Sequence, residues 1–394
     1  MGHRVGPVAV TRDGAVDLLR RYHEALNSHN VPALMAMYAE DAVAVSPIFH
    51  TLKGRPAIQE SFENLFALVP DYRVDPNESL FIYEGDRAAE VSTASATRYD
   101  ALFGVPSTEH RIEYQIVRLL TFKDTRIVYE QRLYDLAGVL ERLEKVRLDD
   151  ELRVAGDIQR TLLARTRHRG AYFEAVGASV PSRAIGGDFF EYADLASGAF
   201  GLAIGDVSGK GPPAALLAAM LQGMFSMEAD TGHAPSVTLA RMNVALVKRG
   251  IEPRFSTLFY GVLAADGVFS YASAGHLPPL LVRRDGSVER LSTGGPILGV
   301  FRDAVFPGGQ VTLDAGDTVV AFSDGMTEAL GATGEEFGDA RLMQVAASQR
   351  GGTPAAMLDA LFSAVREFSG SAATTAVDDL TVTVVRFGEG DGNR

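Results

Sequence analysis

Apolar side chains follow two different periods along the first part of the chain. From Val16 to Leu26 they recur at spacings of three and four residues, which predicts an amphipathic helix. The polar run Asn27–Asn30 ends this helix, and a second one is predicted over Val31–Tyr38. Segments rich in Val, Ile, Thr and Tyr then predict three strands: Ala88–Thr97, Ile112–Phe122 and Arg126–Tyr134. Helices followed by a run of strands indicate an α+β domain, which we place at residues 10–136.

Residues 137–168 are predicted to form a helical linker that enters from the last strand. Four leucines around its start have the 3-4-3 spacing of a coiled-coil seam: Leu133, Leu136, Leu140 and Leu143. Arg147 and Asp150 interrupt the seam, and an apolar stripe resumes in a shifted register at Leu152, Ala155, Ile158 and Leu162. Two interpretations stay open. The segment is either a connector packed on its own domains or a dimerising helix whose register carries a signal.

The third region, residues 170–387, alternates short β-rich runs with long helical stretches. The expected strands are Phe200–Ile204, Thr257–Leu263, Val268–Ala272, Pro279–Val282, Thr318–Phe322 and Leu380–Arg386. The expected helices are Pro213–Ala229, Ser236–Lys248 and Pro354–Phe368. Many short strands with a few long helices favour a β-sandwich that carries helices on its outer faces.

Composition narrows the classes of function. The chain has 394 residues, 46% of them hydrophobic and 22% charged, so we expect a globular protein of two or three domains. A net charge of −13 argues against nucleic acid and anionic membrane as partners. The absence of Cys excludes disulfides, thiolate metal sites and cysteine nucleophiles. We find no signal-peptide pattern and no apolar run of about 18 residues, and therefore expect a cytoplasmic protein.

Four acidic motifs in the third region place an aspartate beside a β-rich run, mostly among small residues. They are Gly186–Phe189, Gly205–Gly211, Ser323–Gly325 and Asp378–Thr381. Hard cations such as Mg²⁺ and Mn²⁺ prefer oxygen ligands and keep several waters. Aspartates without His or Cys beside them therefore indicate Mg²⁺ or Mn²⁺ rather than zinc. One such aspartate alone is most simply a turn residue, whereas four in one domain predict a shared site.

Five segments, in this order, resemble the SpoIIE/RsbU-type bacterial serine phosphatases of the PPM superfamily. They are Gly186–Phe190, Gly205–Gly211 with the Ala/Leu/Met helix after it, Ser273–Pro279, Phe322–Gly325 and Asp378–Thr381. The resemblance covers residues 170–387 and implies an α/β/β/α sandwich. It also implies hydrolysis of phosphoserine or phosphothreonine on a protein by a centre of two metal ions, Mn²⁺ or Mg²⁺.

The resemblance assigns roles to single residues. Asp206 is expected to bridge both ions, and the Val207 carbonyl to bind one of them. Asp188 is expected to contribute directly or through a water, so that Asp188 and Asp206 are the catalytic candidates. Asp324 and Asp378 are expected to complete the other ion's ligands.

Several neighbours of these ligands have weaker assignments. Asp378 is preferred over Asp379, whose alternative role is support through hydrogen bonds. Arg183 is either a bidentate clamp for the substrate phosphate or a solvated surface arginine. Lys210 has the same two interpretations, and His276 is expected to be structural rather than a catalytic acid. The resemblance makes the first two predicted helices of this region a regulatory element beside the metals.

The first region resembles the SnoaL-like, nuclear-transport-factor-like cone, a curved antiparallel sheet around a pocket. The resemblance rests on the helix–Asn-Ser-His-Asn–helix start, Tyr38–Val43, Lys53–Ile58 and the terminal strand Arg126–Leu136. Such cones serve as isomerases, cyclases, ligand sensors or dimerisation modules, so the fold does not fix the function. Four side chains are candidates to line a pocket: Tyr22, His23, Asp41 and His50.

These features together predict a metal-dependent protein phosphatase controlled by an N-terminal sensory and dimerisation cone through the helical linker. The resemblance implies a phosphorylated anti-anti-sigma protein of the STAS class as substrate, a homodimer, and a small ligand in the cone as a further candidate partner. Two alternatives remain. One is a pseudophosphatase scaffold that binds the STAS protein without hydrolysis, and the other is an isomerase or cyclase whose chemistry lies in the cone.

Overall fold

Two compact units make up the chain, Met1–Glu151 and Leu152–Arg394. The computed structural model describes residues 10–97, 111–162, 166–250, 255–370 and 378–388, without the side chains of residues 76–79. The domain boundaries expected from the sequence therefore include segments outside the described residues. Among the described residues, no helix has the length and apolar content needed to cross a membrane.

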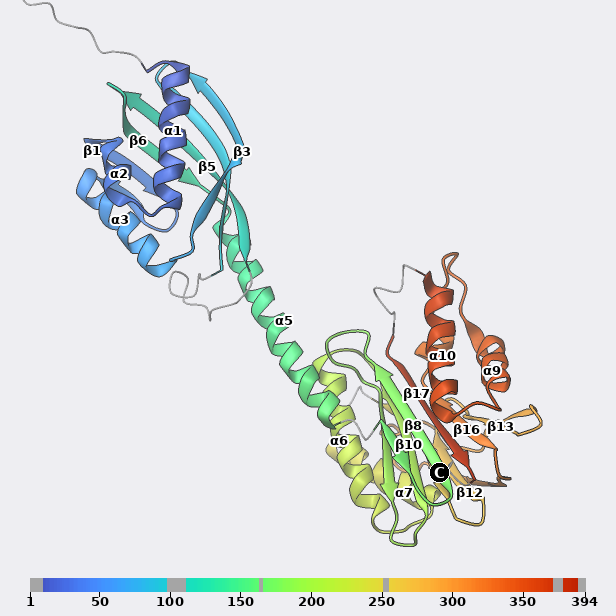
Figure 1. Cartoon of the computed structure of the whole chain (residues 1–394). Helices are drawn as coiled ribbons and strands as arrows, with labels where there is room; N and C mark the ends of the chain where they lie inside the picture. Colours follow the sequence, from blue (N-terminus) through green and yellow to red (C-terminus); the bar gives the residue numbers. More distant parts are fainter. Residues whose placement is uncertain (1–9, 98–110, 163–165, 251–254, 371–377, 389–394) are drawn as a thin grey trace, which may run out of the picture. The chain divides into compact units, whose positions relative to one another are not determined.

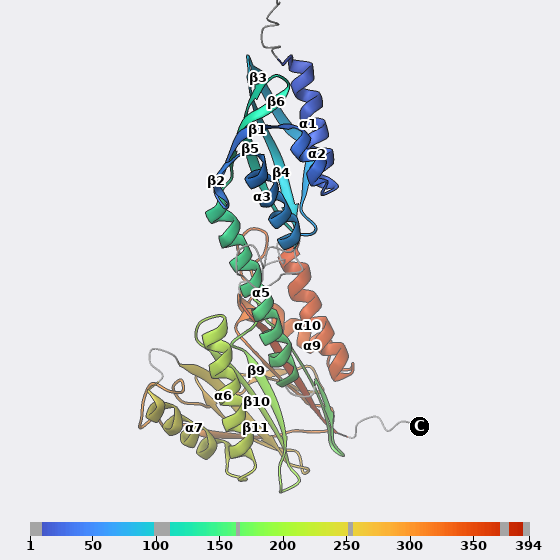
Figure 2. The ribbon, with the colours of Figure 1, turned by 90° about the vertical axis from the view of Figure 1, so that its left-hand side faces the viewer.

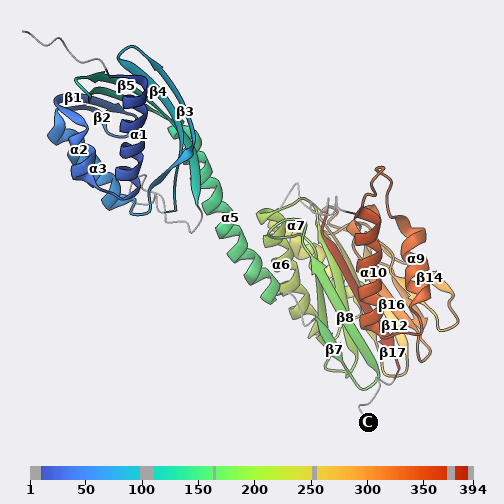
Figure 3. The same cartoon turned by 45° about the horizontal axis from the view of Figure 1, so that its top comes forward.

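The first unit is a curved six-stranded sheet with three helices in its hollow (Figure 3). The strand order is β2-β1-β6-β5-β4-β3. The helices are α1 (Arg12–Asn27), α2 (Val31–Ala36) and α3 (Arg55–Leu68). The strands are β1 (Tyr38–Ser46), β2 (His50–Lys53), β3 (Arg73–Glu84), β4 (Arg87–Ala96), β5 (Ile112–Lys123) and β6 (Arg126–Leu133). Strict alternation of buried and exposed residues along β5 directs every second side chain into the core between sheet and helices.

The three strands predicted for this unit are confirmed to within one residue at each end. The second predicted helix is too long, because Tyr38 already begins β1. The strand β3 was not predicted. It carries Pro76 and Asn77, which are turn residues in sequence terms, and its pairing with β4 shifts register between Asp75 and Leu80.

The linker helix α5 runs from Leu136 to Leu162. Its start is fixed by Asp135, whose Oδ1 accepts a hydrogen bond from the Gly138 N–H at 2.9 Å. The seam expected over Leu133–Leu143 is wrong, because Leu133 belongs to strand β6 and not to the helix. Val139 and Leu143 instead bury in the core of the first unit, as the connector interpretation requires. Further along, the apolar side chains are exposed: Leu148 at 51%, Ile158 at 58% and Leu162 at 56%.

The second unit is a sandwich of two antiparallel sheets. One sheet has the order β15-β12-β11-β10-β9 and the other β14-β13-β16-β17-β8-β7. The first contains β9 (Phe189–Asp194), β10 (Phe200–Val207), β11 (Ser256–Leu263), β12 (Val268–Ala274) and β15 (Gly308–Thr312). The second contains β7 (Arg167–Arg169), β8 (Phe173–Val180), β13 (Leu280–Val282), β14 (Val288–Arg290), β16 (Thr318–Phe322) and β17 (Leu380–Phe387).

Helices cover the outer face of each sheet. The helices α6 (Pro212–Ala229) and α7 (Pro235–Arg249) pack on the first sheet, as Figure 2 shows. The helices α9 (Gly338–Ser348) and α10 (Pro354–Ser369) pack on the second (Figure 1). The short α8 (Gly325–Glu328) follows β16. Aromatic and aliphatic side chains of both sheets fill the space between them, and two further apolar layers lie under the helix pairs. The predicted α+β class and the α/β/β/α sandwich are both confirmed.

Candidate active site

Four strand ends meet at one edge of the sandwich. Because β9 and β10 are antiparallel, the residue before β9 lies beside the end of β10, and the same holds for β17 and β16. Asp188 immediately precedes β9 and Asp206 is the penultimate residue of β10. Asp324 follows β16 by two residues, and Asp378 lies two residues before β17. Carboxylates far apart in sequence thus converge where the sheets present their loops.

Asp188 is buried and Asp206, beside it, is half-buried. Burial first, and then the neighbouring Asp206 carboxylate, hold the pKa of Asp188 well above its usual range. Burial and the Asp324 carboxylate raise the pKa of Asp206 to about 6, although a hydrogen bond with Asp188 opposes the shift. Oδ2 of Asp188 is buried and has no hydrogen-bond partner within the described structure. A buried acceptor without a donor is costly and marks a place where a cation fits.

Asp324 and Asp378 form the more open side of the cluster. Burial and the Asp378 carboxylate raise the pKa of Asp324. The side chain of Asp378 is 38% exposed, and its Oδ2 lies 3.1 Å from the Nζ of Lys210. Lys210 belongs to the Gly-rich loop that follows β10, so this loop brings a positive charge to the acidic edge. The ammonium group therefore offsets part of the repulsion among the carboxylates.

Asp379 has a different surrounding from Asp378. Its Oδ1 accepts hydrogen bonds from the backbone N–H and the hydroxyl of Ser182, at 2.7 and 2.9 Å. Its Oδ2 accepts from the backbone N–H of Gly187 at 2.7 Å and more weakly from that of Asp188. Both oxygens are thus occupied by the loop that carries Asp188. This geometry favours Asp379 as a residue that positions the loop, and it leaves Asp378 as the better ligand candidate.

Gly187 lets the Asp188 loop approach the end of β10. A Cβ at this position would lie 2.8 Å from the carbonyl oxygen of Val207, which is closer than real Cβ contacts come. The Val207 carbonyl therefore lies beside the loop that carries Asp188. At the other side of the site, a Cβ on Gly325 would lie 2.1 Å from the carbonyl oxygen of Asp379. Both glycines are required by close backbone approach.

The donor set fits hard divalent cations. Four carboxylates and one backbone carbonyl offer oxygen ligands, and the raised pKa values of Asp188, Asp206 and Asp324 reflect burial and crowded negative charge that Lys210 offsets only in part. In the described part of the chain, however, no three Asp, Glu or His side chains already stand in an arrangement that could hold one ion. Lys210 forms an ion pair with Asp378, and the side chains of Asp188 and Asp206 share a hydrogen bond. Ion binding therefore requires these side chains to turn away from their present partners.

The remaining sequence candidates lie around this cluster. Arg183 is exposed on the loop between Ser182 and Asp188. His276 is buried, its Nδ1 lies 2.8 Å from the Thr257 hydroxyl, and burial lowers its pKa to about 4. His276 is thus a neutral histidine that is hydrogen-bonded to Thr257 on β11, which is the structural role expected for it.

One group of contacting residues was missed from the sequence. The last turns of α5 lie against the Asp188 loop, where Gln159 makes hydrogen bonds with the backbone of Gly186. A Cβ on Gly156 would lie 2.3 Å from the Ala184 carbonyl, so the helix and the loop are in close contact. The sequence signal for this contact was a small residue, Gly156, and an amide, Gln159, next to the apolar stripe of the linker.

Family models match both units. The model for stage II sporulation protein E (SpoIIE) matches residues 196–388, and the model for the SnoaL-like domain matches residues 19–130. The SiaA-PP2C domain of Pseudomonas aeruginosa has the same fold as the second unit, with a TM-score of 0.54 and 19% identity. That similarity covers 62% of this chain and 98% of the SiaA domain.

Curated relatives match the second unit. Phosphoserine phosphatase RsbU of Bacillus subtilis is 33% identical over 184 residues, which are 46% of this chain and 54% of RsbU. Protein IcfG of Synechocystis is 27% identical over 192 residues, 42% of this chain and 30% of IcfG. The chain thus spans about half or less of the length of these relatives.

Proposed function

Since residues 196–388 match the SpoIIE family model and residues 19–130 match the SnoaL-like model, we propose that this protein is a metal-dependent protein serine/threonine phosphatase. The observation that supports the activity is the meeting of Asp188, Asp206, Asp324 and Asp378 at one edge of the sandwich. These carboxylates come from four strand ends. A family match alone would not require them all to be present and adjacent.

In this proposal Asp206 and Asp188 hold the buried side of a pair of Mn²⁺ or Mg²⁺ ions, with the Val207 carbonyl between them. Asp324 and Asp378 hold the open side. When bound, such ions activate a water and neutralise charge on the phosphoryl group. Asp379 keeps the Asp188 loop in place through its four hydrogen-bonding contacts. Arg183, exposed on the same loop, is the candidate that reaches for the substrate phosphate.

We propose a phosphoserine on a STAS-class anti-anti-sigma protein as the substrate, and the cytoplasm as the location. RsbU, to which this domain is similar, is named as a phosphoserine phosphatase. The open edge formed by Asp324 and Asp378 suits a phosphoserine carried on a protein surface, because these carboxylates are only partly buried. The Gly-rich loop with Lys210 lies beside them.

The test of the activity is Mn²⁺- or Mg²⁺-dependent phosphate release from a phosphoserine STAS protein. Asp206→Asn should abolish release and keep the fold by circular dichroism, because one uncharged amide replaces one ligand. Asp230→Asn, at the exposed end of α6, is the matched control and should behave as wild type. Absence of release together with retained binding of the STAS protein would favour the pseudophosphatase scaffold instead.

We further propose that the first unit controls the phosphatase through α5 as a homodimer. The second half of α5 exposes an apolar stripe of Leu148, Ala155, Ile158 and Leu162, in which three members are seven residues apart. Ile158→Glu should turn a dimer into a monomer in light scattering and change the phosphatase rate. Arg160→Glu, which alters only a surface ion pair with Asp157, is the control.

The isomerase or cyclase alternative has less support. It needs a buried base free to take a proton from a substrate. Among the described residues of the cone, the buried acids are Glu90, which contacts His23 and Arg118, and Glu130, which contacts Arg132; these contacts lower the pKa of both despite their burial. Neither carboxylate is free for proton abstraction.

A further inference from the structure

The inner face of the cone's sheet buries a row of charged side chains that the phosphatase proposal does not use. Glu90 on β4, Arg118 on β5 and Arg132 on β6 are register partners across three neighbouring strands. Arg118 is 2% exposed and Arg132 is 7% exposed. Two guanidinium groups opposite each other on adjacent strands repel, and buried charges are costly unless paired. The row therefore needs negative partners.

Two carboxylates provide these partners. Arg118 donates to Glu90 at 3.1 Å, and Arg132 donates to Glu130 at 2.8 Å. His23 on α1 also contacts Glu90, so three basic side chains share two carboxylates. The Nε of Arg118 is buried and makes no hydrogen bond among the residues that the structure describes, and the Oε1 of Glu130 lies 3.8 Å from it. The network thus retains one N–H donor that is paired with a carboxylate by charge but not by a hydrogen bond.

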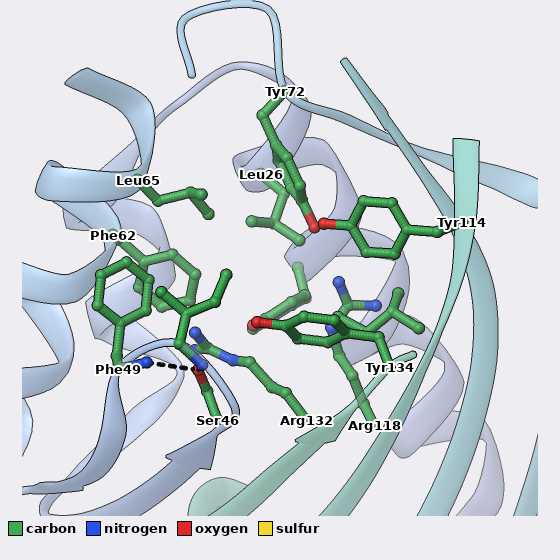
Figure 4. A pocket seen from close by; sticks show the side chains of 13 residues that line it. Leu26, Ser46, Phe49, Phe62, Leu65, Tyr72, Tyr114, Arg118, Arg132 and Tyr134 are labelled. Atoms are coloured by element: carbon green, nitrogen blue, oxygen red, sulfur yellow. Dashed lines mark hydrogen bonds between the residues drawn. The ribbon is translucent and has the colours of Figure 1, made fainter. Parts of the chain in front are cut away.

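A cavity of about 30 Å³ adjoins both guanidinium groups. Figure 4 shows Arg118 and Arg132 entering it from the strands, with Phe49 and Phe62 on one side and the hydroxyls of three tyrosines on the other: Tyr72, Tyr114 and Tyr134. Burial raises the pKa of Tyr134 to about 12, so this hydroxyl keeps its proton. The cavity combines cationic donors, a phenol and an apolar wall.

We propose that this cavity is a binding site for a small monocarboxylate of acetate or propionate size. The carboxylate lies on Arg118 and Arg132, which present planar forks of N–H donors that match it. The alkyl group packs against Phe49 and Phe62. The proposal gives the cone a class of ligand. Neither the fold nor the phosphatase proposal names one.

The cavity volume limits the size of the ligand and its affinity. About 10–15 Å³ of such volume holds one water, so 30 Å³ admits a solute of only a few heavy atoms unless the tyrosines move. Four heavy atoms at the highest known efficiency per atom correspond to a dissociation constant no tighter than about 40 μM. Binding is therefore expected in the range from tens of micromolar to millimolar.

The experiment is calorimetric titration of the full chain with sodium acetate and sodium propionate, with acetamide as the uncharged isostere and sodium chloride as the ionic control. Tyrosine fluorescence gives a second readout, because the chain has 12 Tyr and no Trp. We expect acetate to bind at least tenfold more tightly than acetamide or chloride. Equal binding of acetate and acetamide, binding of chloride alone, or no carboxylate binding overturns the proposal.

A cavity-filling variant locates the site without removing a buried charge. Leu65→Phe on α3 adds volume at the cavity wall, and Ala67→Phe on the exposed side of the same helix is the matched control. Leu65→Phe should weaken acetate binding at least tenfold with an unchanged circular dichroism spectrum, and Ala67→Phe should not. Unchanged acetate binding by a folded Leu65→Phe variant would place the ligand elsewhere and overturn the assignment.

Discussion

The side-chain amide of Gln159 is bonded to both backbone groups of Gly186. Its Nε2 donates to the Gly186 carbonyl at 2.8 Å, and its Oε1 accepts from the Gly186 N–H at 3.1 Å. Gly186 lies two residues before Asp188, so the last turns of the linker helix hold the loop that carries a candidate metal ligand. A rotation or shift of α5 would therefore act on Asp188 through a pair of hydrogen bonds.

Gln159→Ala should weaken the response to metal more than it weakens the fold. Two hydrogen bonds of about 0.5–1.5 kcal/mol each are lost, about 1–3 kcal/mol together, which corresponds to an about 5- to 150-fold higher Mn²⁺ concentration for half-maximal phosphatase activity. Arg160→Ala, the next residue, removes only a surface contact with Asp157 and serves as the control. If both variants titrate with Mn²⁺ alike, Gln159 does not couple the helix to the site.

Most of the fold and the four acidic motifs could be predicted from the sequence, because the segments that form them carry local signals. The strand β10 is a continuous apolar run that ends in Asp206, and α6 begins at a Pro pair after a Gly-rich loop. Such segments have local signals. The strand β8 was missed because Glu174, Gly177 and Ser179 break its apolar pattern, and the short β14 offers only three residues.

Contacts between residues far apart along the chain could not be predicted from the sequence pattern. The hydrogen bonds from Ser182 and Gly187 to Asp379 join residues almost 200 positions apart, and no spacing rule reveals them. The prediction of a leucine seam in the linker was wrong for a related reason. A leucine spacing of 3-4-3 is equally compatible with a strand end followed by a helix, and Asp135 places that boundary between Leu133 and Leu136. Asp41 and His50, named as pocket candidates, are exposed, whereas Tyr22 does line the cavity and His23 is buried beside it against Glu90.

Asp378→Asn and Asp379→Asn should give different defects although the residues are adjacent. Asp379→Asn replaces an acceptor of backbone N–H groups by an NH₂ group, which leaves buried donors unpaired at a cost of about 1–3 kcal/mol each. We expect a lower urea midpoint for this variant in metal-free buffer. Asp378→Asn should unfold near the wild-type midpoint and lose Mn²⁺ binding in calorimetry. Equal stability of the two variants would contradict the positioning role of Asp379.

Lys210→Gln should strengthen metal binding slightly. The Lys210–Asp378 pair is partly exposed, so its contribution is about 0.2–1 kcal/mol, and an ion must displace it to reach Asp378. Removing the ammonium group therefore lowers the dissociation constant for Mn²⁺ by about 1.5- to 5-fold in calorimetry. A decrease in kcat/KM in the same variant would show that Lys210 also contacts the substrate phosphate. A weaker Mn²⁺ affinity would mean that Lys210 supports the ligands rather than competing with ions.

His276 should make the second unit less stable at mildly acidic pH. Burial lowers the pKa of this imidazole to about 4, whereas an unfolded chain has a His pKa of about 6.5. Between these values the unfolded state binds the proton and the folded state does not, so stability is complete above pH 6.5 and falls as the pH falls toward 4. From pH 7.5 to 4.5 this loss amounts to about 2–3 kcal/mol.

The measurement is urea unfolding at both pH values in metal-free buffer, comparing wild type with His276→Gln. The glutamine amide can keep a hydrogen bond to Thr257 but does not titrate, so the variant should lose about 2–3 kcal/mol less than wild type over the same pH range. His233→Gln is the control, because His233 is exposed beside the end of α6. Its pH dependence should match wild type. Identical pH dependence in all three proteins would show that His276 is protonated in the folded state, and its role as a buried, neutral partner of Thr257 would then be wrong.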